Sequence, residues 1–170
     1  MPELIVLLPT RDEENGIGEV IRRIPTKSLQ EMGFQTRVVV ADGHSTDSTL
    51  EIANRMGAEV IRQNGSIGKG NGVREALKVI FETPPKDGDL LIMLDADATY
   101  SPEDLPRFIE ELEHNDVVWG SRLRGKIEKK AMSFTNLIGN KILSLAASVI
   151  FLKRTTDLCT GYWGFRKASL

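Results

Sequence analysis

The chain has 170 residues, 41% of them hydrophobic, which suits a single domain with a hydrophobic core. Its formal net charge of −2 conceals an asymmetry: residues 122–154 carry eight Lys or Arg and one acid, leaving −9 for the remainder. The single cysteine, Cys159, excludes an internal disulfide and fits a reducing compartment. The sequence predicts neither a signal peptide nor a spanning helix, since its apolar runs are too short.

Short apolar segments alternate with amphipathic ones along the first 120 residues. The predicted strands are 4–8, 37–41, 58–62, 90–94 and 116–120, and the predicted helices cover 17–24, 50–56, 76–81 and 102–114. This strand-helix alternation predicts an α/β fold with a mostly parallel central sheet and helices on both faces.

The first two strands end in polar loops. In the first loop, Pro9 is followed by Arg11 and Glu13, which could hydrogen-bond a base or a sugar. A charged loop that only starts the next helix is the alternative. Asp42 stands at the end of the second strand, where an acid is well placed to accept hydrogen bonds from a ribose or base.

A glycine-rich segment, 64–72, separates the third strand from its helix. Glycines let the backbone approach a phosphate closely, and Lys69 could supply positive charge. The segment is not a P-loop, because Gly70 and not Ser or Thr follows Lys69. A flexible turn that only allows tight packing is the alternative.

The fourth strand ends in Asp95-Ala96-Asp97. Carboxylates two residues apart on an extended chain point to the same side, so Asp95 and Asp97 could hold one divalent cation. In open α/β sheets, ligands bind outside the carboxyl ends of the strands. Solvated turn residues or a helix cap are the alternative, but Ser101 and Pro102 already give the next helix an N-cap and a first residue.

The sequence of residues 134–152 predicts an unusually apolar helix with basic residues at both ends. Such a helix could lie against lipid headgroups, or pack on the sheet or on a partner chain. The basic segment has almost no interleaved aromatic residues, which argues against nucleic-acid binding.

In this order, the motifs resemble those of the family 2 glycosyltransferases, particularly the branch that moves a sugar onto a polyprenyl phosphate, such as the dolichol-phosphate mannose synthases. The matching segments are Pro9–Glu13, Asp42–Asp47, Gly68–Gly70, Asp95–Asp97, Gly120–Arg122, Leu137–Asn140 and Asp157–Gly161, with Arg166.

The resemblance implies a glycosyltransferase A fold, Rossmann-like, in one domain over residues 1–170, with a nucleotide-sugar part at 1–121 and an acceptor part at 122–170. It implies a GDP- or UDP-sugar donor, a polyprenyl-phosphate acceptor, and Mg²⁺ or Mn²⁺ held by Asp95 and Asp97. The expected nucleotide-binding residues are Pro9, Arg11, Glu13, Asp42, Lys69, Asp95 and Ala96.

Arg122 and Asp157 are the expected catalytic residues. An anionic phosphate acceptor needs positioning, for which Arg122, Arg124 and Lys129 are candidates, more than it needs a base. With a hydroxyl acceptor, Asp157 would be the base. A single displacement predicts inversion, and the expected location is peripheral, on the cytoplasmic face of a membrane.

Two alternatives remain at this point. Asp95-Ala96-Asp97-Ala98-Thr99 also matches the nucleophile loop of haloacid-dehalogenase-type phosphatases, in which Asp95 would be phosphorylated. That loop normally follows the first strand of its domain, however, and here three strands precede it. The other alternative is a non-catalytic nucleotide-sugar-binding domain. The end at Leu170, directly after an aromatic segment, is typical of a piece of a longer polypeptide.

Overall fold

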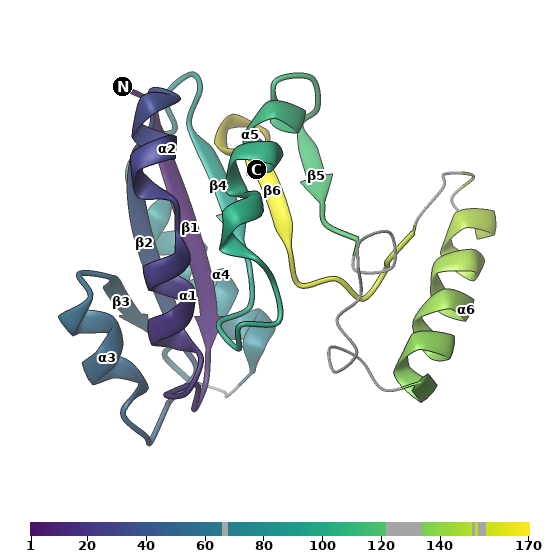
Figure 1. Ribbon diagram of the computed structural model, residues 1–170, viewed down its shortest axis with the longest axis horizontal. Coiled ribbons are helices and arrows are strands. Elements are labelled where there is room, and N and C mark those ends of the chain that lie inside the picture. Colours follow the sequence, from purple (N-terminus) through teal and green to yellow (C-terminus); the bar gives the residue numbers. More distant parts are fainter. Residues whose placement is uncertain (66–67, 122–133, 151, 153–155) are drawn as a thin grey trace. The chain divides into compact units, whose positions relative to one another are not determined.

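The computed structural model describes residues 1–65, 68–121, 134–150, 152 and 156–170 of the chain. These residues form two compact units (Figure 1). The larger unit comprises Met1–Val118 and Gly164–Leu170, and the smaller comprises Trp119–Trp163.

The sheet has six strands in the order β3-β2-β1-β4-β6-β5. Their bounds are β1 Glu3–Thr10, β2 Gln35–Asp42, β3 Glu59–Arg62, β4 Leu90–Met93, β5 Val117–Trp119 and β6 Trp163–Arg166. The first four strands pair in parallel, which confirms the predicted parallel sheet. The chain runs outward from β1 to β3 and then returns to the other side of β1 to form β4. The space beyond the ends of β1 and β4 is therefore the point where strand order reverses, the usual ligand site of such sheets.

The last two strands run antiparallel to each other. Gly120 N donates to Tyr162 O at 2.9 Å, and Arg166 N donates to Asp116 O at 3.0 Å, so residue numbers rise on one strand as they fall on the other. β5 was expected from the sequence, whereas β6 was not.

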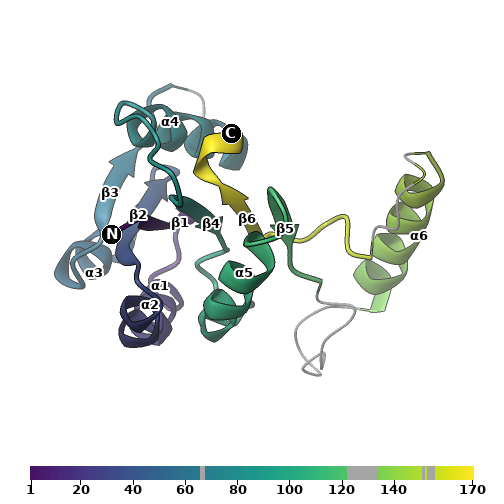
Figure 2. The same ribbon diagram turned by 90° about the horizontal axis from the view of Figure 1, so that it is seen from above.

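Helices cover both faces of the parallel strands, with α4 on one face and α1, α2 and α5 on the other (Figure 2). The helices are α1 Ile17–Arg23, α2 Thr26–Glu31, α3 Thr49–Arg55, α4 Lys69–Ile80, α5 Leu105–Leu112 and α6 Phe134–Ile150, with 3₁₀ turns η1 Pro102–Asp104 and η2 Lys167–Ser169. Ser101 is the N-cap residue of η1 and Pro102 its first residue, as predicted, but the Ser101 side chain makes no capping hydrogen bond. The Ser101 hydroxyl donates to Glu103, and the chain enters α5 through η1 without a side-chain cap.

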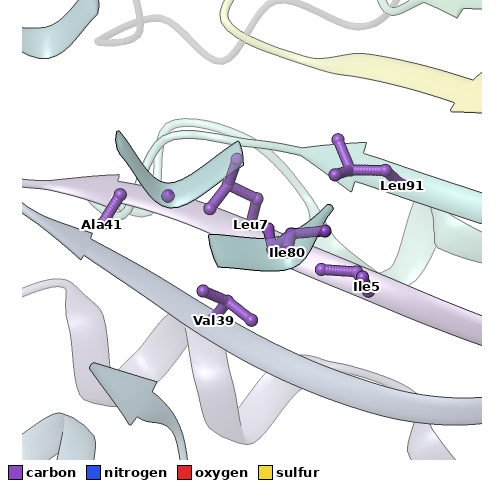
Figure 3. Packing of buried hydrophobic residues seen from close by; sticks show 7 residues of the cluster. Ile5, Leu7, Val39, Ala41, Ile80 and Leu91 are labelled. Carbon is purple, nitrogen blue, oxygen red and sulfur yellow. The ribbon is translucent and has the colours of Figure 1, made fainter. Parts of the chain in front are cut away.

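The core under α4 follows from the two-residue period of the strands. Ile5, Leu7, Val39, Ala41 and Leu91 point from β1, β2 and β4 toward the Ala76 and Ile80 side chains of α4, and all are at most 2% exposed (Figure 3). The alternate residues of β1, including Leu4 and Val6, are equally buried on the opposite face. β1 is therefore a central strand, as its continuous apolar run predicts.

In the smaller unit, α6 buries polar residues and exposes apolar ones. Asn140 and Ser144 are buried: Asn140 Nδ2 donates to Asp157 Oδ1 at 2.6 Å, and Leu158 N donates to Ser144 Oγ at 2.9 Å. The exposed side chains include Leu145 at 67% and Val149 at 66%. Within the described part of the chain, no helix combines the length and apolar character needed to cross a bilayer.

Candidate active site

A pocket of about 290 Å³ lies at the carboxyl ends of β1, β2 and β4, in the larger unit. Its lining combines both signs of charge with small neutral residues. The charged residues are Arg11, Glu13, Lys69, Asp95 and Asp97, and the neutral ones are Pro9, Thr10, Ala41, Gly43, Gln63, Gly68, Gly72 and Ala96. The structure thus brings together every residue expected to bind the nucleotide or the metal, except Asp42.

Asp95 and Asp97 lie beyond the end of β4, which stops at Met93, so they occupy a bend and not the strand itself. Asp97 is exposed, and its Oδ1 accepts a hydrogen bond from Thr99 N at 2.9 Å. The ammonium group of Lys69, at the start of α4, is hydrogen-bonded to Asp95 Oδ1. The lysine therefore places a positive charge beside this pair of acids. A metal ion would compete with Lys69 for the Asp95 carboxylate, and a phosphate group would compete with Asp95 for the Lys69 ammonium group.

Gly16, the N-cap of α1, allows the Asp95–Asp97 bend to come close to α1. A Cβ atom on Gly16 would lie 2.5 Å from Ala96 O, closer than real Cβ atoms come, and 3.0 Å from Asp97 Cα. Only glycine fits this contact without displacing the bend. No local pattern singles out Gly16, because the contact joins segments 80 residues apart.

The pKa of Glu13 reflects the negative charge of the neighbouring acids in the pocket. Its pKa is raised, first by burial and then by the negative charges of Asp97 and Asp95. A cation bound among these acids would relieve the repulsion. The site is therefore electronegative around its three carboxylates.

The residues suit a hard divalent cation that is also held by a ligand. In the described ranges, no three His, Cys, Asp or Glu side chains form a complete metal site. Mg²⁺ is usually held in proteins by one or two carboxylates, with substrate phosphates and waters completing its shell. Asp95 and Asp97 provide that kind of partial site.

The first two polar loops brace each other through side-chain to main-chain hydrogen bonds. Asp12 N donates to Ser45 Oγ at 3.0 Å, and Thr46 N donates back to Asp12 Oδ1 at 2.7 Å. Farther along, Glu13 N donates to Thr49 Oγ1 at 2.8 Å, next to the start of α3. The loop that carries Arg11 and Glu13 is thereby fixed by its neighbour.

Asp42 does not line the pocket. It is fully buried, its Oδ1 accepts a hydrogen bond from Ser45 N at 3.0 Å, and Arg62 Nε lies 3.3 Å from its Oδ2. Successive residues of a strand face opposite sides, and Ala41 faces α4, so Asp42 faces away from it. Its nucleotide-binding role stays a prediction, and its contacts in the structure support the second loop.

The residues that we expect on the acceptor side are described only in part. Arg122, Arg124 and Lys129 lie outside the described residues. Asp157 belongs to the smaller unit, where it is 1% exposed and accepts the hydrogen bond from Asn140. A lining residue that sequence reasoning missed is Gln63, which directly follows β3 and is 2% exposed. A glutamine after a strand carries no signal by itself, and only its burial draws attention to it.

Several known proteins are similar to this chain. It is 36% identical over 165 residues to glycosyltransferase AglJ of Haloferax volcanii, covering 96% of this chain and 50% of that protein. It is 32% identical to the dolichyl-phosphate hexose transferase of the same organism, covering 99% of this chain and 68% of the relative. The chain spans half of AglJ and 46% of the dolichol-phosphate mannosyltransferase of Pyrococcus furiosus, to which it is 27% identical.

A solved structure of similar fold is the glucosyl-3-phosphoglycerate synthase of Mycobacterium tuberculosis in complex with UDP, with a TM-score of 0.69 and 24% identity. The match covers 98% of this chain and 57% of the synthase. At that identity the likeness shows the fold, which is the glycosyltransferase A fold expected from the motifs. The family model described as glycosyl transferase family 2 matches residues 5–170, nearly the whole sequence. The chain therefore belongs to glycosyl transferase family 2.

Proposed function

We propose that the chain transfers a sugar from a nucleoside-diphosphate sugar to a polyprenyl phosphate. The observation that carries this proposal is the pocket at the strand-order reversal, where Lys69 and two carboxylates after β4 line one cavity. Two relatives support the acceptor class, since one is a dolichyl-phosphate hexose transferase and the other a dolichol-phosphate mannosyltransferase.

The donor diphosphate is proposed to bind between the Asp95–Asp97 bend and the start of α4. Lys69 would supply a positive charge there, and the first turn of α4 would add the main-chain N–H groups of a helix N-terminus. Asp95 and Asp97 would hold Mg²⁺ or Mn²⁺. When bound, the cation neutralises negative charge that develops on the leaving diphosphate.

The proposed step is one displacement at the anomeric carbon. An oxygen of the acceptor phosphate forms a bond to this carbon, the bond to the donor diphosphate breaks, and its electron pair leaves with the nucleoside diphosphate. The configuration at the carbon is inverted. An ionised phosphate needs no base, so the proposed role of Arg122, Arg124 and Lys129 is to position it.

The proposed site of action is the cytoplasmic surface of a membrane, where a polyprenyl phosphate is found. The exposed apolar side of α6, with Leu145 and Val149, supports this proposal, as does the +7 charge of residues 122–154. The proposed role of residues 122–170 is to form the acceptor side of one functional domain.

Family membership decides against the haloacid-dehalogenase-type phosphatase, because this chain matches glycosyl transferase family 2 over residues 5–170. A non-catalytic nucleotide-sugar-binding domain is the remaining alternative. Binding or hydrolysis of the donor without transfer to any polyprenyl phosphate would favour it.

The first prediction concerns Asp97→Ala. We expect UDP- or GDP-sugars to bind in the presence of Mn²⁺ and to bind about 10- to 100-fold more weakly to the variant, because a charged contact is lost. Calorimetric titration of both proteins with and without Mn²⁺ measures the effect. The control is Asp87→Ala, an exposed acid that does not line this pocket. Unchanged affinity in Asp97→Ala would contradict the proposed site.

A further inference from the structure

Gln63 has a buried side-chain amide that the fold does not use. The residue is 2% exposed and lines the pocket. Among the residues that the structure describes, neither Oε1 nor Nε2 of Gln63 has a hydrogen-bond partner. Buried amides are nearly always paired, because an unpaired one loses its bonds to water without replacing them. The pocket that Gln63 lines is where a ligand could supply the missing partner.

The fold holds Gln63 in place. Gln63 N donates to Asp42 O at 3.0 Å and extends the pairing of β3 with β2. Ile61 pairs with Ala41, whose side chain faces α4, and Gln63 is two residues farther on, so it lies on the same face. A Cβ atom on Gly72 of α4 would lie 3.1 Å from Gln63 Oε1, so the helix closes tightly over the amide. The sheet therefore holds the main chain of Gln63, and the amide lies against Gly72 of α4.

The pocket wall around Gln63 suits a neutral, flat ligand group. The diphosphate and the cation are proposed to use the charged residues of the pocket. Near Gln63 the lining is neutral and small, with Ala41 and Gly72. The other uncharged polar side chain of the lining is Thr10, whose hydroxyl already donates to Leu8 O at 2.9 Å. Gln63 is thus the described lining side chain with a neutral donor and a neutral acceptor both unpaired.

We infer that Gln63 reads the hydrogen-bonding edge of the donor's nucleobase, an inference that rests on the proposed function. A primary amide presents a donor beside an acceptor, which complements a ring N–H beside a ring carbonyl through two hydrogen bonds. Uracil and guanine both carry that edge. Gln63 is then a specificity-determining residue of the transferase, and it contributes to affinity through the base alone.

The test combines Gln63→Leu with a change in the ligand. The full chain with Mn²⁺ is titrated with UDP, GDP, their forms methylated at the ring N–H, and ribose 5-diphosphate, which lacks a base. For the tighter nucleotide, we expect Gln63→Leu to weaken binding about 10- to 100-fold, the worth of two hydrogen bonds. Methylation should weaken wild-type binding similarly and have little further effect on Gln63→Leu. Ribose 5-diphosphate should bind both proteins equally.

The possible outcomes separate this inference from the proposed function. The base-reading role is overturned if Gln63→Leu weakens the binding of ribose 5-diphosphate as much as the binding of the nucleotide. It is also overturned if the substitution and the methyl group weaken nucleotide binding independently of each other. In both cases nucleotide binding itself stands. If wild type binds neither nucleotide, both proposals fail. Folding is checked by thermal melting without ligand. Gln63→Leu should melt about 2–4 °C higher, since it removes two unpaired buried polar atoms.

Gln63→Glu provides a second variant of nearly the same size. It keeps an acceptor but loses the amide donor, so it should not restore the affinity for UDP, whereas it should retain the affinity for ribose 5-diphosphate. Wild-type affinity for UDP in Gln63→Glu would overturn the role of the amide.

Discussion

At the scale of single residues, the position of the Asp95–Asp97 bend depends on a glycine that has no chemistry of its own. Gly16 touches Ala96 O and the Asp97 main chain so closely that no side chain fits between them. The carboxylates of the proposed cation site are therefore positioned from the start of α1 as well as from the end of β4.

Gly16→Ala should lower nucleotide affinity without adding or removing any charge. Because the new methyl group must displace the Asp95–Asp97 bend, we expect at least about a tenfold loss of Mn²⁺-dependent binding and a loss of about 1–3 kcal/mol in stability. Titration and chemical denaturation measure the two effects.

Gly139→Ala is the matched control for this substitution. A Cβ atom on Gly139, within α6, would meet no atom of the described residues within 4 Å, so the same change should be tolerated or slightly stabilising. Equal behaviour of the two variants would show that the Gly16 contact does not control the bend.

The residues of the pocket differ in how visible they are in the sequence. Asp95 and Asp97 could be predicted because two acids directly after a buried strand form a local pattern. Gln63 could not, because its significance lies in its burial and in the absence of described partners for its amide. Asp42 shows the opposite case. Its place at a strand end suggested a ligand contact, whereas strand alternation turns it away from the side that faces α4.

At the scale of elements, an ion pair joins α1 to η1 and makes stability depend on pH. Arg23 Nε donates to Glu103 Oε1 at 2.8 Å, and Arg23 Nη2 donates to Oε2 at 3.0 Å. This bidentate bond lowers the pKa of Glu103 from 4.5 to about 2. The contribution is present above the unfolded pKa of Glu103 and is lost as the pH falls toward the folded value.

Glu103→Gln should therefore lower the free energy of unfolding at pH 7 and have less effect at acidic pH. The Arg23 and Glu103 side chains are 35% and 51% exposed, so solvent screening keeps the loss below about 1 kcal/mol. Urea denaturation at pH 7 and at pH values down to 2 measures it. Glu110→Gln, on the exposed side of α5, is the control. A loss that grows as the pH falls would contradict the ion-pair account.

Helix α6 presents apolar side chains where a surface helix usually presents polar ones. Replacing Leu145 and Val149 together by Ser should weaken binding to vesicles that contain anionic lipid by about tenfold or more, because two buried apolar side chains are lost from the interface. Vesicle flotation measures the bound fraction.

Val79→Ser is the control for the α6 variant, since Val79 is an exposed apolar residue of α4, 37% exposed, in the other unit. Equal flotation of the wild type and both variants would contradict the proposal that α6 binds the membrane surface.

The elements themselves were unequally predictable. β1, β2 and β4 follow from apolar runs that are buried on both faces, a pattern that depends only on the sequence of the strand. β6 was missed because Trp163–Arg166 includes Gly164 and shows no clear alternation. Its place in the sheet depends on packing instead, since a Cβ atom on Gly164 would lie 2.9 Å from Phe108. α2 was missed because it is a single short helix with one buried residue, Leu29.

At the scale of the whole molecule, ligand binding should appear as thermal stability. A ligand that binds only the folded state at about 100 times its dissociation constant adds about 2.7 kcal/mol, or about 5–10 °C in melting temperature for a domain of this size. We expect this shift for Mn²⁺ together with UDP or GDP, and a clearly smaller one for Mn²⁺ alone, because two carboxylates hold the ion only in part.

Asp97→Ala serves as the control in the same melting experiment, since it should lose most of the shift. A full shift in that variant, or the same shift with the nucleotide in the absence of any divalent cation, would contradict the proposed joint site.

The reciprocal bonds between Asp12, Ser45 and Thr46 also constrain how this pocket can change over time. Each loop supplies both donors and acceptors to the other, so a substitution on one side leaves an unmatched group on the other. A new preference for a nucleotide sugar should therefore be easier to acquire at a position outside these two loops, such as the proposed base-reading residue Gln63, than within them. Lineages that alter these reciprocal bonds should carry compensating changes in both loops, and covariation between the loops would be their evolutionary signature.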